Sequence, residues 1–317
     1  MVAYTGIQGQ NILIVSSDPA NPTEGQIWYN STSNLLKGYQ FVAAAWASGG
    51  NLNTARGFTL GNAGTQTAAL AFGGANPAPT AASESYNGTS WTNTPSLNTA
   101  RKYLASCGTQ TSALGFGGNS VPQNATESWN GSSWTSVNSL NQQRFALGGF
   151  GIQTAALAFA GFSAPAGRTD VESWNGTSWT TLPATYPAGK ADLNGFGIQT
   201  AGIGFGGTAP PTTDTNSWNG TSWTNVNSLN TGRGGHAGAS GTQTAGLVFG
   251  NTSATESWNG TSWTTVPASL ATSRSYLGGC GTQTTALAFG GNPPAAGTSS
   301  TEEFTGAALV IRTITTS

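Results

Sequence analysis

The chain has 317 residues, a formal net charge of -1 and only 7% charged residues, against about 25% in ordinary soluble proteins. This near-neutral balance gives no electrostatic attraction to nucleic acid or anionic membranes, and no apolar run reaches transmembrane length. The 11 tryptophans argue against a disordered low-complexity chain, because aromatic side chains that recur in register form a core.

Residues 1–35 are predicted to form a separate N-terminal segment built on a β-hairpin. Residues 1–10 lack the basic stretch followed by an apolar one that marks a signal peptide, so none is expected. The stretch DPANPTEGQIWYN at residues 18–30 contains turn residues and then an aromatic strand. The loop is expected at residues 31–34, and the partner strand begins after it.

This segment resembles one that is common near the N-terminus of bacteriophage virion proteins, especially tail fibres and related appendages. The shared pattern is a Pro-Gly turn, an aromatic strand, a polar turn, a Leu-Lys-x-Tyr strand and a Trp. Here the last two parts are Leu36-Lys37-Gly38-Tyr39 and Trp46. The resemblance implies a place on the exterior of a phage particle, with the segment contacting other virion proteins.

Residues 36–317 carry an internal repeat, which is the strongest indication of the fold. The phrase Gly-(Thr/Ile)-Gln-Thr begins at Gly64, Gly108, Gly151, Gly197, Gly241 and Gly281, so successive copies start 40 to 46 residues apart. A period in the forties made of strand-like pieces is typical of a propeller. We therefore predict an all-β protein, a six-bladed β-propeller of four-stranded antiparallel blades after the hairpin segment.

A second phrase, Ser-Trp-Asn-Gly-Thr-Ser-Trp-Thr or a variant, falls between these copies and predicts the outer hairpin of each blade. Asn130-Gly131 is expected to form a two-residue type I′ turn, which would place Trp129 opposite Ser132 and Glu127 opposite Trp134. The glutamines of the first phrase are expected to be exposed and to serve only their own turns. They are Gln66, Gln110, Gln153, Gln199, Gln243 and Gln283.

The four-stranded unit resembles the kelch repeat over roughly residues 36–313. In four copies the second strand ends in Gly-Gly, as at Gly117-Gly118, and an aromatic residue and then a Trp follow on the next two strands. Ala160-Gly161 depart from the doublet, and the aromatic-to-Trp spacing is shorter than in kelch proteins. The resemblance implies the fold and not the activity, since kelch propellers host both sugar oxidation and protein binding.

The sequence allows two ways for the ring to close. Six inner hairpins are matched by seven outer ones, of which the extra copy lies at residues 36–48. Either this copy supplies the outer strand of the last blade while residues 309–316 leave the ring, or both ends close locally and the N-terminal hairpin caps one blade.

The loops between the second and third strands of each blade vary in length and sequence, and most contain proline. Variable, stiff loops on a rigid scaffold suit ligand recognition, while neutral drift is the alternative. They are expected at the end of the ring opposite the repeated turns. The candidate recognition residues are Asn76, Pro77, Pro79, Val121, Gln123, Pro165, Arg168, Pro210, Thr212, Asn292 and Pro293.

Basic residues recur at one repeat position and acids at another. The basic positions are Arg56, Arg101, Arg144, Lys190, Arg233 and Arg274. An acid begins the third strand in five copies, with Asn216 as the exception. These charges form either a cationic ring that grips an anionic glycan or structural ion pairs, and the nearly equal counts favour ion pairs.

No catalytic, cofactor or metal site is expected. Cys107 and Cys280 share one repeat position in distant copies and are interpreted as buried fillers. His236, the single histidine, has no repeated acid or nucleophile beside it, so a loop position is favoured over a general base. Adjacent Glu302 and Glu303 would face opposite sides of a strand, which suits no glycosidase geometry.

The leading hypothesis is a non-enzymatic bacteriophage virion protein, a tail fibre or an appendage of head or tail, whose propeller recognises a host-surface glycan or receptor. The first alternative is a decoration protein of head or tail with a purely structural role, and the second is a carbohydrate-active enzyme. We expect neither a nucleic-acid partner nor membrane insertion, and a homo-oligomer is compatible with the sequence.

Overall fold

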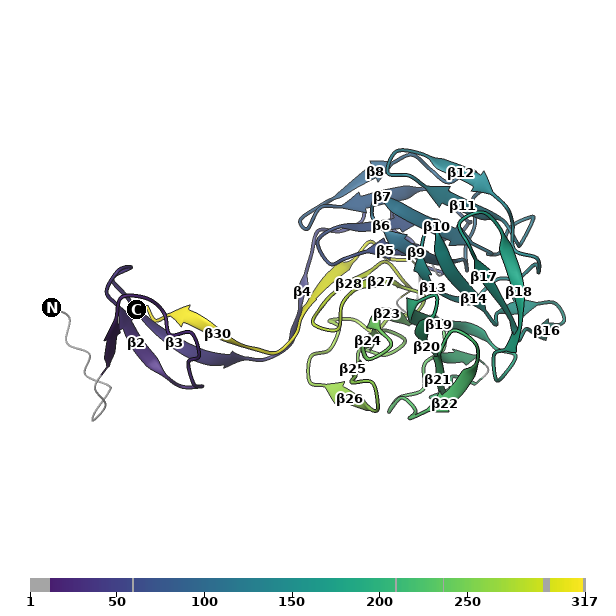
Figure 1. Ribbon diagram of the computed structural model, residues 1–317. Helices are drawn as coiled ribbons and strands as arrows, with labels where there is room; N and C mark the ends of the chain where they lie inside the picture. The colour runs from purple at the N-terminus through teal and green to yellow at the C-terminus, as the bar shows by residue number, and fades with distance from the viewer. Residues whose placement is uncertain (1–11, 59, 209, 236, 293–296, 316–317) are drawn as a thin grey trace. The chain divides into compact units, whose positions relative to one another are not determined.

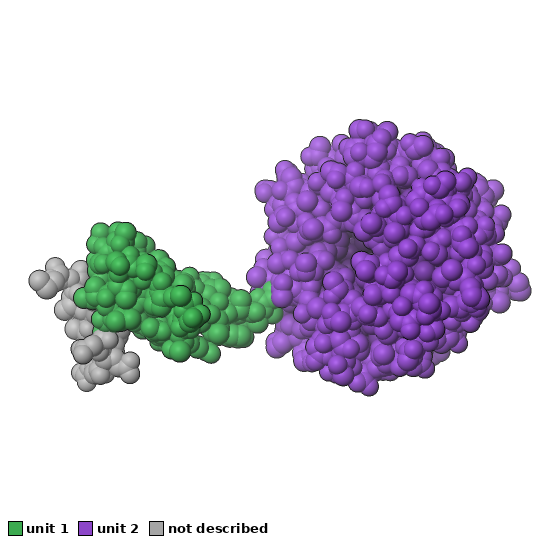
Figure 2. Space-filling model, in the orientation of Figure 1, with its two compact units in different colours: residues 1–44, 306–317 green, residues 45–305 purple. Residues whose placement is uncertain are grey.

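The computed structural model describes residues 12–58, 60–208, 210–235, 237–292 and 297–315. Within these ranges every regular element is a β-strand. The chain divides into two compact units, which are coloured differently in Figure 2. Unit 1 comprises residues 1–44 and 306–317, and unit 2 comprises residues 45–305.

Unit 1 is one four-stranded sheet, in the order β1 (Leu13–Val15), β2 (Ile27–Asn30), β3 (Leu35–Val42) and β30 (Ala308–Thr313). β1 runs parallel to β2, and the other pairs are antiparallel. The predicted hairpin is present, since β2 and β3 flank residues 31–34. Asp18 fixes the preceding loop by accepting hydrogen bonds from Trp28 Nε1 (3.0 Å) and Lys37 Nζ (2.7 Å).

Unit 2 contains six four-stranded antiparallel sheets, numbered here in chain order. Sheet 1 is β5 (Gly61–Gly64), β6 (Ala69–Phe72), β7 (Ser83–Tyr86) and β8 (Trp91–Thr94); sheet 2 is β9 (Ala105–Thr109), β10 (Ser112–Phe116), β11 (Thr126–Trp129) and β12 (Trp134–Val137); sheet 3 is β13 (Gly148–Ile152), β14 (Ala155–Phe159), β17 (Asp170–Trp174) and β18 (Trp179–Thr185).

The remaining strands complete the set. Sheet 4 is β19 (Ala191–Ile198), β20 (Ala201–Thr208), β21 (Thr215–Trp218) and β22 (Trp223–Val226); sheet 5 is β23 (Gly238–Thr242), β24 (Ala245–Phe249), β25 (Thr255–Trp258) and β26 (Trp263–Val266); sheet 6 is β27 (Gly278–Gly281), β28 (Thr285–Phe289), β29 (Thr301–Thr305) and β4 (Ala45–Ser48). A two-stranded ribbon, β15 (Phe162–Ser163) and β16 (Ala166–Gly167), lies in a loop of sheet 3.

Neighbouring sheets of unit 2 contact one another through their first strands, and Figure 1 shows them arranged around a common centre. The contacts run from β5 to β9, β13, β19, β23 and β27, and β27 also contacts β5. Small residues occupy this crowded centre. A Cβ at Gly149 would lie 2.5 Å from the Phe116 ring of the preceding sheet. The architecture is therefore all-β and consistent with a propeller-like fold.

The two ends of the chain exchange strands in a way that corrects one sequence prediction. The expected hairpin at residues 36–48 does not form, because β3 belongs to unit 1 while β4 pairs with β29 of sheet 6, placing Trp46 opposite Phe304. β30 pairs with β3, so that Leu309 lies opposite Phe41. The N-terminal strand thus supplies the fourth strand of sheet 6, and unit 1 extends to residue 44 instead of 35.

The Asn-Gly turns also differ from the expected type I′ geometry. In sheet 2, Trp129 lies opposite Trp134, so the loop has four residues and not two. Asn130 Oδ1 accepts backbone hydrogen bonds from Ser132 and Ser133 at 2.9 Å, and of the central pair only Gly131 has positive φ, at 93°. The asparagine side chain closes the turn together with a backbone hydrogen bond from Asn130 N to Ser133 O (3.3 Å). The two indoles become direct cross-strand partners, with ring centroids 5.4 Å apart.

In four sheets the tryptophan near the start of the fourth strand donates its indole N–H to a threonine hydroxyl of the preceding sheet, while Trp134 and Trp223 do not. Trp179 Nε1 donates to Thr126 Oγ1 at 3.1 Å, and the same bond joins Trp263 to Thr215 at 3.2 Å. Sheet 3 has Val171 at the threonine position, directly before Glu172. The indole N–H of Trp223 in sheet 4 is accordingly buried with no hydrogen-bond partner among the described residues.

We expect Val171→Thr to raise the free energy of unfolding by about 1 kcal/mol, because its hydroxyl would accept the buried Trp223 N–H. Urea-induced unfolding of the purified protein measures the change. Thr126→Val is the matched control and should lower the free energy of unfolding by about 1–3 kcal/mol, since it leaves the Trp179 N–H unpaired. A destabilised Val171→Thr protein would contradict the assignment.

Candidate functional site

Five of the six recurrent basic residues are buried in ion pairs with the acids of the third strands. The contacts are Arg56–Glu84 (2.6 Å), Arg101–Glu127 (3.1 Å), Arg144–Glu172 (2.9 Å), Arg233–Glu256 (2.8 Å) and Arg274–Glu302 (2.9 Å). The arginine side chains are at most 1% exposed. They are structural ion pairs, and they cannot form a ring of cations that contacts an anionic glycan.

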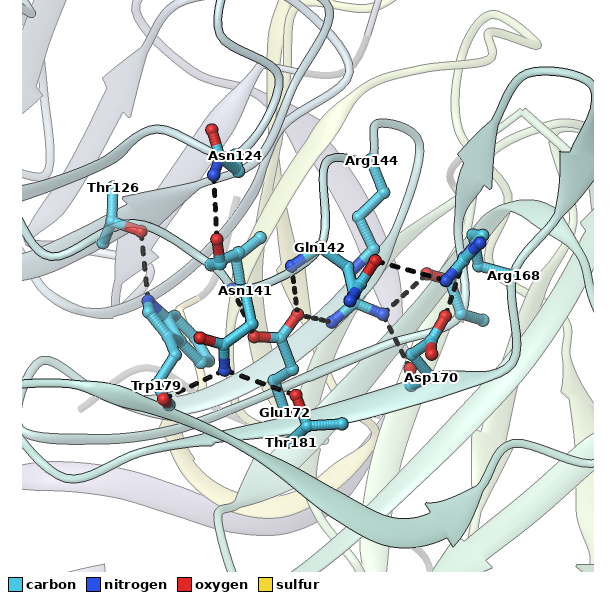
Figure 3. Close-up of polar contacts among 12 residues, drawn as sticks. Asn124, Thr126, Asn141, Gln142, Arg144, Arg168, Asp170, Glu172, Trp179 and Thr181 are labelled. Atoms are coloured by element: carbon cyan, nitrogen blue, oxygen red, sulfur yellow. Dashed lines mark hydrogen bonds and ion pairs between the residues drawn. The ribbon is translucent and has the colours of Figure 1, made fainter.

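Figure 3 shows how the pair in sheet 3 fastens the loop that enters the sheet. Arg144 Nη1 donates to the carbonyls of Asp170 (2.6 Å) and Ala160 (3.1 Å). The free carboxylate oxygen of Glu172 accepts the backbone N–H of Asn141 at 2.7 Å. Burial lowers the pKa of Arg144, and the charge of Glu172 opposes that shift. The pair therefore holds the loop between sheets 2 and 3 against the third strand of sheet 3.

Sheet 4 departs from this arrangement at several positions together. Asn216 replaces the glutamate, and its amide donates to the Tyr186 hydroxyl at 3.0 Å. Lys190 replaces the arginine and pairs with Asp214, whose side chain is 55% exposed. The cation has moved toward the surface where its buried partner is missing, which avoids an unpaired buried charge.

We expect Glu172→Ala to lower the free energy of unfolding by about 3–5 kcal/mol, because it leaves the buried Arg144 charge unpaired. Asp214→Ala breaks a pair with an exposed partner and should cost about 0–1 kcal/mol. Chemical denaturation of both variants gives the comparison. Equal losses in the two would contradict the role assigned to the buried pair.

The repeated glutamines link neighbouring sheets, which corrects the expectation that they are exposed and serve only their turns. Each is half-buried, and Nε2 donates to a carbonyl at the end of the third strand of the preceding sheet. Gln110 donates to Tyr86 O (2.5 Å), and Gln66 of sheet 1 donates to Phe304 O of sheet 6 (2.7 Å). The first phrase of the repeat thus encodes contacts between sheets.

Four backbone hydrogen bonds join neighbouring sheets at the end of unit 2 that carries the variable loops. Two residues after each recurrent basic position, the chain adopts the left-handed conformation. This αL set comprises Phe58, Tyr103, Ala146, Asp192, Gly235 and Tyr276, with φ between 53° and 63°. Tyr103 N donates to Phe58 O (3.0 Å), and Ala146 N donates to Tyr103 O (2.8 Å). These bonds offset the strain of a conformation that residues other than glycine disfavour.

The αL set brings aromatic side chains together that are far apart in sequence. Phe58, Tyr103 and Tyr276 form a triangle with centroid separations of 5.6–6.0 Å. Phe145 lies 6.1 Å from Tyr103, and Phe162 lies 5.5 Å from Phe145. All five rings, called here the aromatic strip, are half-buried. The sequence signal that could have located three of them is their fixed spacing after the basic position.

Two charged groups accompany the aromatic strip. Lys102 Nζ lies over the rings of Phe58 and Tyr103, at 4.8 Å and 5.3 Å from their centroids. Asp192 accepts a hydrogen bond from Thr208 Oγ1 (3.2 Å) and is hydrogen-bonded to Tyr276. Burial, followed by the charge of Asp192, raises the pKa of Tyr276 to about 12. The phenol therefore stays protonated at neutral pH.

We expect the Tyr276 ring resonance to titrate near pH 12 in NMR spectra, with Tyr276→Phe providing its assignment. Because the pKa is raised above 10.0, the stability contributed by the neutral phenol is complete below pH 10 and is lost as the pH rises through about 12. Asp192→Asn should move the midpoint toward 10. An unchanged midpoint in that variant would contradict the coupling to Asp192.

The predicted recognition loops lie beside the αL set. Isolated bridges join Lys102 to Asn119 and Ser275 to Asn292, so each loop begins next to the residue that precedes an αL position. Six predicted recognition residues are exposed, namely Asn76, Pro77, Pro79, Val121, Pro165 and Pro210. Four are half-buried, namely Gln123, Arg168, Thr212 and Asn292. Pro293 and His236 fall outside the described residues.

A groove connects two of these loops to the aromatic strip. It has a volume of about 280 Å³ and is lined by Ser120, Val121, Gln123, Gln143, Phe145 and Ser163. Val121 is 94% exposed at its edge. Arg168, from the same region, is instead held by Asp170 at 2.7 Å (Figure 3). The structure thus brings Val121 and Gln123 together with Phe145, and it engages Arg168 in a local ion pair.

The two cysteines are buried and unbonded to each other. Burial raises the pKa of the Cys280 thiol to about 12, so it is protonated at neutral pH. Among the described residues, no group of three or more His, Cys, Asp or Glu side chains is placed to hold a metal ion. No helix long and apolar enough to cross a membrane occurs in the same part of the chain.

No protein-family model matches the chain, and no curated protein matches it either.

Proposed function

We propose that this chain is a bacteriophage virion protein, a tail fibre or an appendage of head or tail, that recognises a glycan on the host surface. The observation that carries the proposal is the aromatic strip, which continues through Phe145 into the groove beside Val121 and Gln123. Aromatic faces stack on the C–H faces of sugar rings, and nearby amides and hydroxyls bind sugar hydroxyls. A half-exposed strip with a polar groove suits a saccharide chain.

We also propose that the six sheets are blades of one closed, kelch-like β-propeller. In support, β27 contacts β5, and Gln66 makes the same link from sheet 1 to sheet 6 that Gln110 makes from sheet 2 to sheet 1. A closed ring would hold the variable loops at fixed separations, which a multivalent surface ligand requires.

Unit 1 is proposed to attach the protein to other virion proteins. Phe41 and Leu309 are cross-strand partners on β3 and β30, and Ile311 follows on the same sheet face opposite Tyr39. Phe41, Leu309 and Ile311 are 56%, 41% and 39% exposed. An apolar patch of this kind favours a docking role. It also favours the alternative of a decoration protein, for which docking would be the whole function.

Binding of the purified full chain to an array of bacterial surface polysaccharides tests recognition. We expect Phe145→Ala and Val121→Asp each to weaken binding about 10-fold, since removal of one interface anchor typically costs more than 1 kcal/mol. Ile152→Ala is the matched control, because Ile152 is an exposed apolar residue (51%) at the last position of β13, at the other end of sheet 3. Its binding should stay within twofold of the unmodified chain.

Two results separate the candidates. Binding to the array or to host cells that is lost in Phe145→Ala supports the recognition role, provided that the variant unfolds at the same temperature as the unmodified protein. Absence of binding to any polysaccharide, together with a phage particle in which this end of unit 2 is covered by neighbouring proteins, would sink it in favour of decoration.

A further inference from the structure

The loop that enters each sheet carries a side chain whose position is set by the repeat. In four sheets this residue is an asparagine three positions before the buried arginine, and its Nδ2 donates to the carbonyl of the first tryptophan of the fourth strand. The distances are 3.1 Å for Asn53–Trp91, 3.3 Å for Asn98–Trp134, 3.1 Å for Asn141–Trp179 and 3.4 Å for Asn230–Trp263.

The same amide has a second acceptor two residues farther along the fourth strand. Asn141 Nδ2 lies 3.3 Å from Thr181 Oγ1, as Figure 3 shows, and Asn98 Nδ2 lies 3.4 Å from Ser136 Oγ. In four sheets, then, one carbonyl and one side-chain oxygen of the fourth strand accept hydrogen bonds from the same amide. These two oxygens form a site for an N–H donor.

Sheet 6 has the corresponding acceptor positions but no asparagine to donate to them. Ala271 occupies the asparagine position, and its backbone N–H still donates to Glu302 Oε2 at 2.8 Å, as Asn141 N does to Glu172. The loop is therefore seated as in the other sheets. The acceptors that correspond by register are the Trp46 carbonyl and the Ser48 hydroxyl. A methyl group can make neither hydrogen bond.

A cavity of about 450 Å³ lies at this place. It is lined by Ser48, Asn51, Ala271, Thr272, Ser300 and Glu302, among others, and we call it the Ala271 pocket. The Glu302 side chain is 8% exposed, whereas the four corresponding glutamates are at most 1% exposed. The missing amide has opened a path from solvent to a carboxylate that is closed in the other sheets.

We propose that the Ala271 pocket binds a neutral saccharide unit, whose hydroxyl groups supply the donors that asparagine supplies elsewhere. The lining offers a carboxylate and several hydroxyls, so a ligand rich in O–H donors satisfies it. Glu302 is already paired with Arg274, so no net charge calls for an ionic ligand. The volume lies in the range of small-ligand sites.

The pocket deepens the proposed function and rests on it. Thr272 and Arg274 belong to the loop that leads into the αL position Tyr276, and Ser300 belongs to the variable loop of sheet 6. The pocket therefore lies at the same end of unit 2 as the aromatic strip. It would act as a second subsite for a glycan.

NMR titration of the full chain with free glucose, galactose and N-acetylglucosamine tests the assignment. We expect at least one sugar to shift the Ala271 and Thr272 methyl resonances, since both residues line the pocket. Ala271→Asn places the repeat's own amide in the pocket and should weaken that binding at least 10-fold. Ala271→Gly leaves the pocket open and should bind within about threefold of the unmodified chain.

Other outcomes separate this proposal from the proposed function. Equal sugar binding by Ala271→Asn and the unmodified chain overturns the pocket assignment. Shifts produced by acetamide and by none of the sugars also overturn it, and assign the pocket to an amide side chain of a partner protein. If Phe145→Ala abolishes polysaccharide binding while Ala271→Asn leaves it unchanged, the proposed function stands and the pocket proposal fails.

Discussion

The buried Arg–Glu pair is the contact on which the arrangement of unit 2 depends. It joins a connecting loop, the end of the second strand and the start of the third strand at one point, as Arg144 and Glu172 do in sheet 3. Burying two charges is tolerated because both carboxylate oxygens of Glu172 and both Nη atoms of Arg144 are hydrogen-bonded, while Nε of Arg144 has no partner among the described residues. Sheet 4 is consistent with this dependence, because it lacks both the glutamate and the arginine and has Asn216 and Lys190 in their places.

The two ends of unit 2 have different physical roles. At one end, the repeated glutamines and tryptophans hydrogen-bond between neighbouring sheets, so each copy must keep the same residues. At the other end, the αL set is held by backbone bonds that any side chain can accompany. Tyr103, Ala146 and Asp192 therefore differ freely at one repeat position. The aromatic strip and the variable loops lie where the scaffold places the fewest demands on side chains.

Much of the architecture could be predicted from the chain itself. The period of the repeat indicated six similar four-stranded units, and the paired charges indicated ion pairs over an exposed cationic ring. What the sequence did not settle is which residues hydrogen-bond or pair with one another. Asn130 was expected to enforce a two-residue turn, but its side chain accepts two backbone N–H groups and holds a four-residue loop. For Trp46 the sequence left open a local hairpin or the outer strand of the last unit, and the structure shows the second, with Trp46 opposite Phe304, more than 250 residues away.

The sequence by itself determined which residues recur and hence which positions form the core of every sheet, because periodicity is a local property of the chain. The tertiary structure alone decided which copies touch. It brings Phe58, Tyr103 and Tyr276 into one cluster and places the Gln66 amide against sheet 6. It also leaves a cavity beside Ala271, at a position that asparagine occupies in four other sheets. These features depend on contacts between distant residues, whose register no local pattern encodes.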